Sequence, residues 1–71
     1  MIHVFVCKLG NSPIKVFLDN NATIEQALQG ANLSLNEGEV VKSASTEMRV
    51  NLSDNVEEGE DYVISKEMKN A

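Results

Sequence analysis

Apolar and polar positions alternate in two short runs near the start of the chain, and this pattern predicts a β-hairpin. The alternating apolar residues are Ile2, Val4, Val6, Ile14, Val16 and Leu18. A period of two is that of a strand with one buried face. The turn-forming residues 10–13 (GNSP) separate the two runs. Two such runs around a short turn are typical of a hairpin.

The segment that follows changes to helical spacing. Thr23 and Gln26 fit a capping box, with Thr23 as the N-cap and Gln26 at the third helical position. The apolar residues at helical spacing are Ile24, Ala27, Leu28 and Ala31. Gly30 lies near the expected end of the helix. Because isolated helices under about 12 residues are marginal in water, we expect this one to pack on the apolar face of the hairpin.

The second half of the chain predicts further strands. In order, its segments are a turn (36–38), a strand (39–43), a second strand (48–52), a loop (53–59) and a last strand (62–64). Val50 and Leu52 are the expected inward residues of the second strand, and Gly59 closes the loop. Residues 1–65 are expected to form one domain and residues 66–71 a frayed tail. The ββαββ(β) order predicts an α+β fold, a single-layer mixed sheet with one helix packed on one face.

Several segments carry a resemblance to a known group: the opening hairpin, residues 22–28 (ATIEQAL), residues 50–52 (VNL) and residues 56–64. Together they resemble the ubiquitin-like β-grasp group, and within it the small ThiS/MoaD-like bacterial sulfur carriers and their phage or mobile-element relatives. The resemblance implies a β-grasp fold over nearly the whole chain. The sulfur carriers of this group end in Gly-Gly, whose carboxylate is adenylated. Lys69, Asn70 and Ala71 stand in that place here, and this disfavours sulfur transfer and conjugation.

Length and charge restrict the classes of function. A chain of 71 residues buries only about 60% of its unfolded surface, so function is expected on a surface rather than in a deep cleft. Eleven acidic and six basic residues give a net charge of −5. This balance provides no cationic footprint for nucleic acid and disfavours an anionic membrane surface. The single cysteine, Cys7, cannot form an intrachain disulfide, which favours a reducing, cytoplasmic location.

Cys7 is also a candidate nucleophile, with His3 as the only histidine. Two residues apart on one strand, their side chains share a face about 6–7 Å apart, which is too far for a direct hydrogen bond. We therefore interpret Cys7 as a structural thiol. No catalytic set can be assembled from the remaining residues, so we predict that the protein is not an enzyme and has no cofactor.

An acidic stretch precedes the last predicted strand. Its five carboxylates within eight residues are Asp54, Glu57, Glu58, Glu60 and Asp61. Their spacing fits no calcium loop, so no metal site is expected. A solvated acidic turn is the simpler interpretation. The functional alternative is an electrostatic docking patch of Glu57, Glu58, Glu60 and Asp61 for a basic partner.

The second face of the hairpin gives the sharpest functional hypothesis. If the alternating aliphatic residues face the helix, Phe5, Cys7 and Phe17 must face the other way. A three-residue turn would place Phe5 directly across from Phe17, and Val63 would join them if its two neighbours point inward. An exposed aromatic patch of this kind usually marks an interaction surface. The opposing interpretation is an inverted register, or loop residues that cover the patch.

The leading hypothesis is thus a non-enzymatic protein-interaction module that docks through the open sheet face around Phe5 and Phe17. Its partner would be another protein or a second copy of the chain. One alternative is a ubiquitin-like modifier or sulfur carrier that uses the carboxylate of Ala71. A second alternative is a small acidic inhibitor of a host or defence protein, whose affinity would fall steeply with salt.

Overall fold

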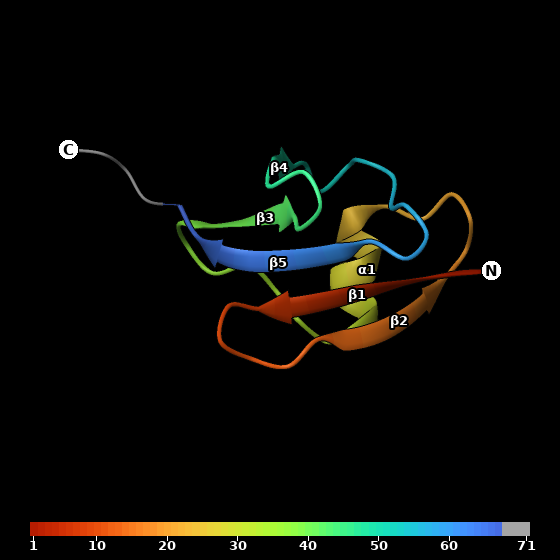
Figure 1. Cartoon of the computed structure of the whole chain (residues 1–71), viewed down its shortest axis with the longest axis horizontal. Coiled ribbons are helices and arrows are strands. Elements are labelled where there is room, and N and C mark those ends of the chain that lie inside the picture. The colour runs from red at the N-terminus through yellow and green to blue at the C-terminus, as the bar shows by residue number, and fades with distance from the viewer. Residues whose placement is uncertain (68–71) are drawn as a thin grey trace.

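The computed structural model describes residues 1–67, which form a five-stranded sheet with one helix on one face (Figure 1). The elements are β1 (Ile2–Lys8), β2 (Ile14–Leu18), α1 (Ile24–Gly30), β3 (Glu39–Ser43), β4 (Arg49–Val50) and β5 (Asp61–Lys66). The strand order is β2-β1-β5-β3-β4. β1 and β5 are parallel and the other neighbouring pairs are antiparallel. The predicted single-layer mixed sheet with one helix is confirmed.

The helix-facing side of the sheet supplies most of the core. The buried cluster consists of Val4, Val6, Val16, Ala22, Ile24, Ala27, Leu28, Ala31, Val41, Val56, Tyr62 and Ile64. The predicted inward face of the hairpin is correct for Val4, Val6 and Val16, and Ile2 and Leu18 pack at its margin. Ile14 is the exception, because its side chain is 40% exposed. A seven-residue helix is only about 10 Å long, and Ile14 at the turn end of β2 is not covered.

The start of α1 confirms the predicted capping box. Thr23 Oγ1 accepts a hydrogen bond from the Gln26 N–H, and Gln26 Oε1 accepts one from the Thr23 N–H. At the other end, Asn32 adopts φ 59° and Leu33 N–H donates to Leu28 O at 2.9 Å. This is a Schellman ending. The helix ends at Gly30 as predicted, but Asn32 takes the left-handed position that terminates it.

The predicted strand at 48–52 is wrong in its extent, because β4 holds only Arg49 and Val50. The chain turns away directly afterwards: Asp54 N–H donates to Asn51 O, and the Asn51 N–H donates to Asp54 Oδ2. Val50 packs at the margin of the core as expected, whereas Leu52 is 36% exposed and does not belong to the core.

The segment after β4 is directed toward the start of α1. The carbonyl of Leu52 accepts the Glu25 N–H at 3.1 Å, and that of Asp54 accepts the Ile24 N–H at 2.9 Å. The first amides of a helix have no partner within it. The loop supplies partners for two of them, and strand pairing beyond Val50 is lost as a result.

The domain boundary expected at residue 65 falls within β5, which includes Lys66. Glu67 N–H donates to Gly38 O at 2.9 Å, beyond the end of the strand. Residues 68–71, which hold the remainder of the expected tail with Lys69, Asn70 and Ala71, lie outside the described residues. Within the described part of the chain, no helix has the length and apolar character needed to cross a membrane.

Candidate functional site

The face of the sheet that α1 does not cover brings the predicted patch residues together. Alternation along the strands places Phe5 and Cys7 of β1, Phe17 of β2 and Val63 of β5 on this open face, because their neighbours along each strand include the buried core residues. The Phe17 side chain is 62% exposed. Phe5, Cys7 and Val63 are half-buried. The expected placement on one face is correct.

The register within the hairpin differs from the expected one. Phe17 lies across from His3, and Phe5 lies across from Lys15. The turn sits closer to β1 than predicted, since Asn11 N–H donates to Lys8 O at 2.9 Å. This shifts the pairing by two residues. A two-residue shift leaves every side chain on its original face, so the open face keeps its members while their neighbours change.

His3 and Lys15 are the members of the open face that sequence reasoning missed. The His3 ring meets the Phe5 ring edge-on, with centroids 5.6 Å apart, and lies 6.3 Å from the Phe17 ring. Lys15 Nζ is 5.2 Å from the centroid of Phe17, within cation–π range. His3 therefore packs among aromatic rings, and no hydrogen bond joins it to Cys7. The same alternation that identified Phe5 and Phe17 places His3 and Lys15 on their face.

Charge is arranged asymmetrically around Phe5. Lys15 pairs with Phe5 from β2 on one side, and Asp61 pairs with it from β5 on the other. The three side chains thus form a row across three strands, with a cation, an aromatic ring and an anion in that order. Such a row favours a partner surface with the complementary order of charges.

The acidic turn packs against the start of β1. Gly59 N–H donates to His3 O at 2.8 Å, and Phe5 N–H donates to Glu60 O at 3.0 Å. Gly59 has φ 79°, a conformation that glycine adopts without the steric cost of a side chain. As predicted, Gly59 closes the turn: Glu60 N–H donates to Glu57 O at 3.2 Å.

The four acidic residues predicted as a docking patch do not act as one group in the structure. Glu60 turns toward the end of β3 and the loop after it, where its carboxylate accepts hydrogen bonds from the hydroxyls of Ser43 in β3 and Ser45 in the loop. Glu57 and Glu58 are exposed in the turn, and Asp61 belongs to the open face. Only Asp61 is therefore placed beside the aromatic residues.

Hydrogen bonding holds the pKa of Glu60 below its ordinary value, chiefly through the Ser45 hydroxyl, and then through Ser43 and the Asp61 N–H. Because this pKa is lower in the folded chain, the carboxylate stabilises the fold at pH values above its unfolded pKa of about 4.5. This contribution is lost as the pH falls through the folded pKa. We expect Glu60→Gln to lower the free energy of unfolding at pH 7 by under about 1 kcal/mol, because the carboxylate is partly exposed.

The difference in free energy of unfolding between Glu60→Gln and the wild type should disappear below about pH 4. Urea unfolding of both chains at about pH 3 to 7 measures it. Glu58→Gln makes the same change of charge on an exposed side chain of the same turn and serves as the control. A gap that is equal at pH 3 and pH 7 would show that the Glu60 carboxylate does not have a lowered pKa.

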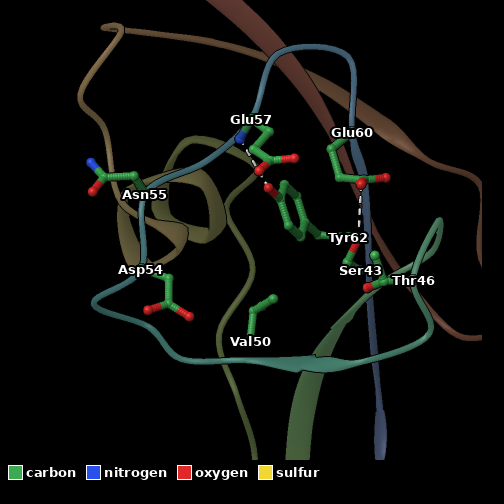
Figure 2. A pocket seen from close by; sticks show the side chains of 8 residues that line it. All are labelled: Ser43, Thr46, Val50, Asp54, Asn55, Glu57, Glu60 and Tyr62. Carbon is green, nitrogen blue, oxygen red and sulfur yellow. Dashed lines mark hydrogen bonds between the residues drawn. The ribbon is translucent and has the colours of Figure 1, made fainter.

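A polar hollow of about 290 Å³ lies between this turn and β3. Figure 2 shows its lining, which consists of Ser43, Thr46, Val50, Asp54, Asn55, Glu57, Glu60 and Tyr62. The buried Tyr62 ring points into it, and its phenol oxygen accepts the Glu57 N–H at 3.0 Å. Burial is the main cause that raises the pKa of Tyr62. Within residues 1–67, no group of three or more metal-ligating side chains lies close enough to hold an ion.

Comparison with known proteins identifies the fold. No protein-family model matches the chain, and no curated protein matches its sequence. The structure is similar to that of SAMP1 from Haloferax volcanii, with a TM-score of 0.73, 12% identity, and coverage of 97% of this chain and 99% of that one. It is also similar to the ubiquitin of Caldiarchaeum subterraneum, with a TM-score of 0.63, 12% identity, and coverage of 99% and 98%. The chain has a small ubiquitin-like β-grasp fold, as predicted. At this identity the likeness shows the fold and does not single out the sulfur carriers within it.

Proposed function

We propose that this ubiquitin-like domain is a non-enzymatic protein-interaction module that docks through the open sheet face centred on Phe5 and Phe17. The observation that carries this proposal is the 62% exposure of the Phe17 side chain on the face opposite α1. Exposed aromatic side chains that lie together are typical of interaction surfaces. Val63 and Cys7 extend the surface toward the middle of the sheet.

The row of Lys15, Phe5 and Asp61 defines the chemistry of the partner. We expect a folded protein with an apolar projection that meets Phe5 and Phe17. An acidic group beside that projection would face Lys15, and a basic group on its other side would face Asp61. Complementary charges of this kind set orientation and association rate more than affinity. Glu57 and Glu58, exposed in the adjoining turn, would add to the attraction of a basic partner.

Two features support a non-enzymatic role. The His3 ring contacts aromatic rings, so the candidate base does not activate the Cys7 thiol. In the polar hollow, the Ser43 hydroxyl donates to Glu60, and the Tyr62 phenol accepts a backbone N–H. These groups have structural partners and lie beside no histidine.

The test compares three chains: the wild type, Phe5→Ser/Phe17→Ser, and Met48→Ser/Leu52→Ser. The last pair is a matched control, because Met48 and Leu52 are exposed apolar side chains outside the open face. A partner is captured with the wild type from a lysate of the source organism, purified, and titrated against each chain by calorimetry. We expect the Phe5/Phe17 variant to bind at least about 30-fold more weakly, the loss typical of a binding hot spot. The control should bind within a few-fold of the wild type.

Circular dichroism and thermal unfolding first establish that each variant is folded. An interaction through the aromatic patch should depend only weakly on salt, whereas an acidic inhibitor would lose affinity steeply. Equal affinity of the three folded chains for the purified partner contradicts the proposal.

A further inference from the structure

The outer edge of β2 carries backbone groups that have no neighbouring strand. In β1 and at the residue after it, the odd-numbered positions bond toward β5 and the turn before it: Phe5 N–H donates to Glu60 O, and Leu9 N–H donates to Ile64 O. The even-numbered residues of β1 must therefore bond toward β2. They pair with Ile14, Val16 and Leu18. In β2, Lys15 and Phe17 accordingly direct their N–H and C=O groups away from the sheet.

The described part of the chain leaves this edge uncovered. β2 is the terminal strand of the sheet. Among residues 1–67, no segment other than β1 and β2 makes a backbone hydrogen bond with Lys15 or Phe17. Ile14 and Phe17 are 40% and 62% exposed. The edge is five residues long and contains no proline. An uncovered edge of this kind is a template for pairing with another strand.

We propose that two copies of the chain pair antiparallel along β2, about a two-fold axis that passes between the Val16 residues of the two copies. Lys15 of each copy then lies opposite Phe17 of the other, and each such pair exchanges two backbone hydrogen bonds. In this register, the outward N–H and C=O groups of Lys15 and Phe17 in both copies all have hydrogen-bond partners. The result is an isologous dimer with a continuous ten-stranded sheet and both helices on the same face.

Side-chain chemistry favours a second copy as the partner strand. In this register the Lys15 ammonium meets the ring of Phe17 from the other copy, a contact already made within one chain at 5.2 Å. On the helix side, Ile14 meets Leu18, and Val16 meets its own counterpart. Lys15 is the only charged side chain of β2, and the two lysines lie diagonally rather than opposite each other. The register therefore opposes no like charges across the axis.

This dimer does not rest on the proposed docking function, although Lys15 and Phe17 belong to both surfaces. It depends on the backbone of β2, whereas Phe5 and Asp61 stay free on the open face. Failure of one proposal therefore leaves the other standing, and Phe5→Ser separates them: it should weaken partner binding without changing self-association.

The first test measures mass against concentration by sedimentation for the wild type, Lys15→Pro and Lys15→Thr. Proline removes the outward N–H of Lys15, which is free in the monomer, and edge strands tolerate proline there. Threonine removes the same side chain but keeps the N–H and favours a strand. A contact this small predicts a weak dimer of the 7.8 kDa chain, with a dissociation constant above about 1 μM. Lys15→Pro should weaken it at least about tenfold, and Lys15→Thr by much less.

The second test is amide hydrogen exchange by NMR at low and high protein concentration. The Lys15 and Phe17 amides should exchange fast in the monomer and become protected as the concentration rises, while the Val16 amide is protected throughout. A chain that stays monomeric at about 1 mM overturns the proposal. So does a dimer whose Lys15 and Phe17 amides remain unprotected, since its copies would then meet at another surface or through another segment.

Discussion

Replacement of Gly30 by alanine is expected to destabilise the protein by about 1–2 kcal/mol, although alanine is the better helix former. A β-carbon on Gly30 would lie 2.6 Å from Val16 Cγ1, well inside van der Waals contact. Val16 is buried and β-branched, so it has little freedom to move. Overpacking of this kind costs about 1–3 kcal/mol, and the helix propensity of alanine returns at most about 1 kcal/mol. Thermal unfolding should show a melting temperature lower by about 4–16 °C.

Two further variants separate the contact from the helix propensity. Gln29→Ala changes an exposed residue of the same helix and should leave the melting temperature nearly unchanged or slightly higher. Val16→Ala removes the atom that the new β-carbon would meet. The double variant Gly30→Ala/Val16→Ala should therefore be more stable than the sum of the two single changes predicts. Additive effects, or a stabilised Gly30→Ala, would show that α1 does not lie this close to β2.

The elements with strong local signals were predictable from the sequence. Thr23 and Gln26 form the capping box that their spacing indicates, because the contacts of a capping box lie within four residues. Val4, Val6 and Val16 lie on the buried face that alternation assigns to them. These features depend on residues that are neighbours in the chain, and the sequence displays them directly.

The errors arise where distant segments decide the local structure. β4 stops at Val50 because the carbonyls of Leu52 and Asp54 bond to amides at the start of α1, more than twenty residues earlier. The strand pattern of residues 48–52 contains no sign of that partner. The hairpin register likewise depends on where the chain turns after Lys8, and β1 at that point is also paired with β5.

The candidate site shows the same division. Period-two alternation was sufficient to place Phe5, Phe17, Val63 and Cys7 on one face. The same alternation assigns His3 and Lys15 to that face as well. The acidic stretch does not form the single docking patch that its sequence suggests, because consecutive side chains in a turn point in several directions. Glu60 accepts hydrogen bonds from Ser43 at the end of β3 and Ser45 in the following loop, which lie seventeen and fifteen positions earlier in the chain.

Tyr62→Phe is expected to lower the free energy of unfolding at pH 7 by about 1–3 kcal/mol. The phenol oxygen accepts the Glu57 N–H at 3.0 Å beside a ring that is 3% exposed. Without that oxygen, a partly buried backbone donor loses its partner, and such a loss costs more than the net value of an ordinary hydrogen bond. The turn that carries Glu57 also bonds to β1, so its loosening should raise amide exchange at Gly59 and Phe5. Urea unfolding at pH 7 measures the stability difference.

The same variant should respond differently to alkaline pH. Burial raises the pKa of Tyr62, and the negative charges of Glu57, Glu60 and Asp54 raise it further, while the hydrogen bond from the Glu57 N–H lowers it. An unfolded tyrosine loses its proton near pH 10, before the folded one does. The stability that the neutral phenol contributes is therefore complete below about pH 10 and is lost as the pH rises through the folded pKa. Because Tyr62 is the only tyrosine, the difference between wild type and Tyr62→Phe isolates its titration. That difference should narrow as the pH rises above about 10, and a constant difference would mean that Tyr62 loses its proton as readily in the folded chain as in the unfolded one.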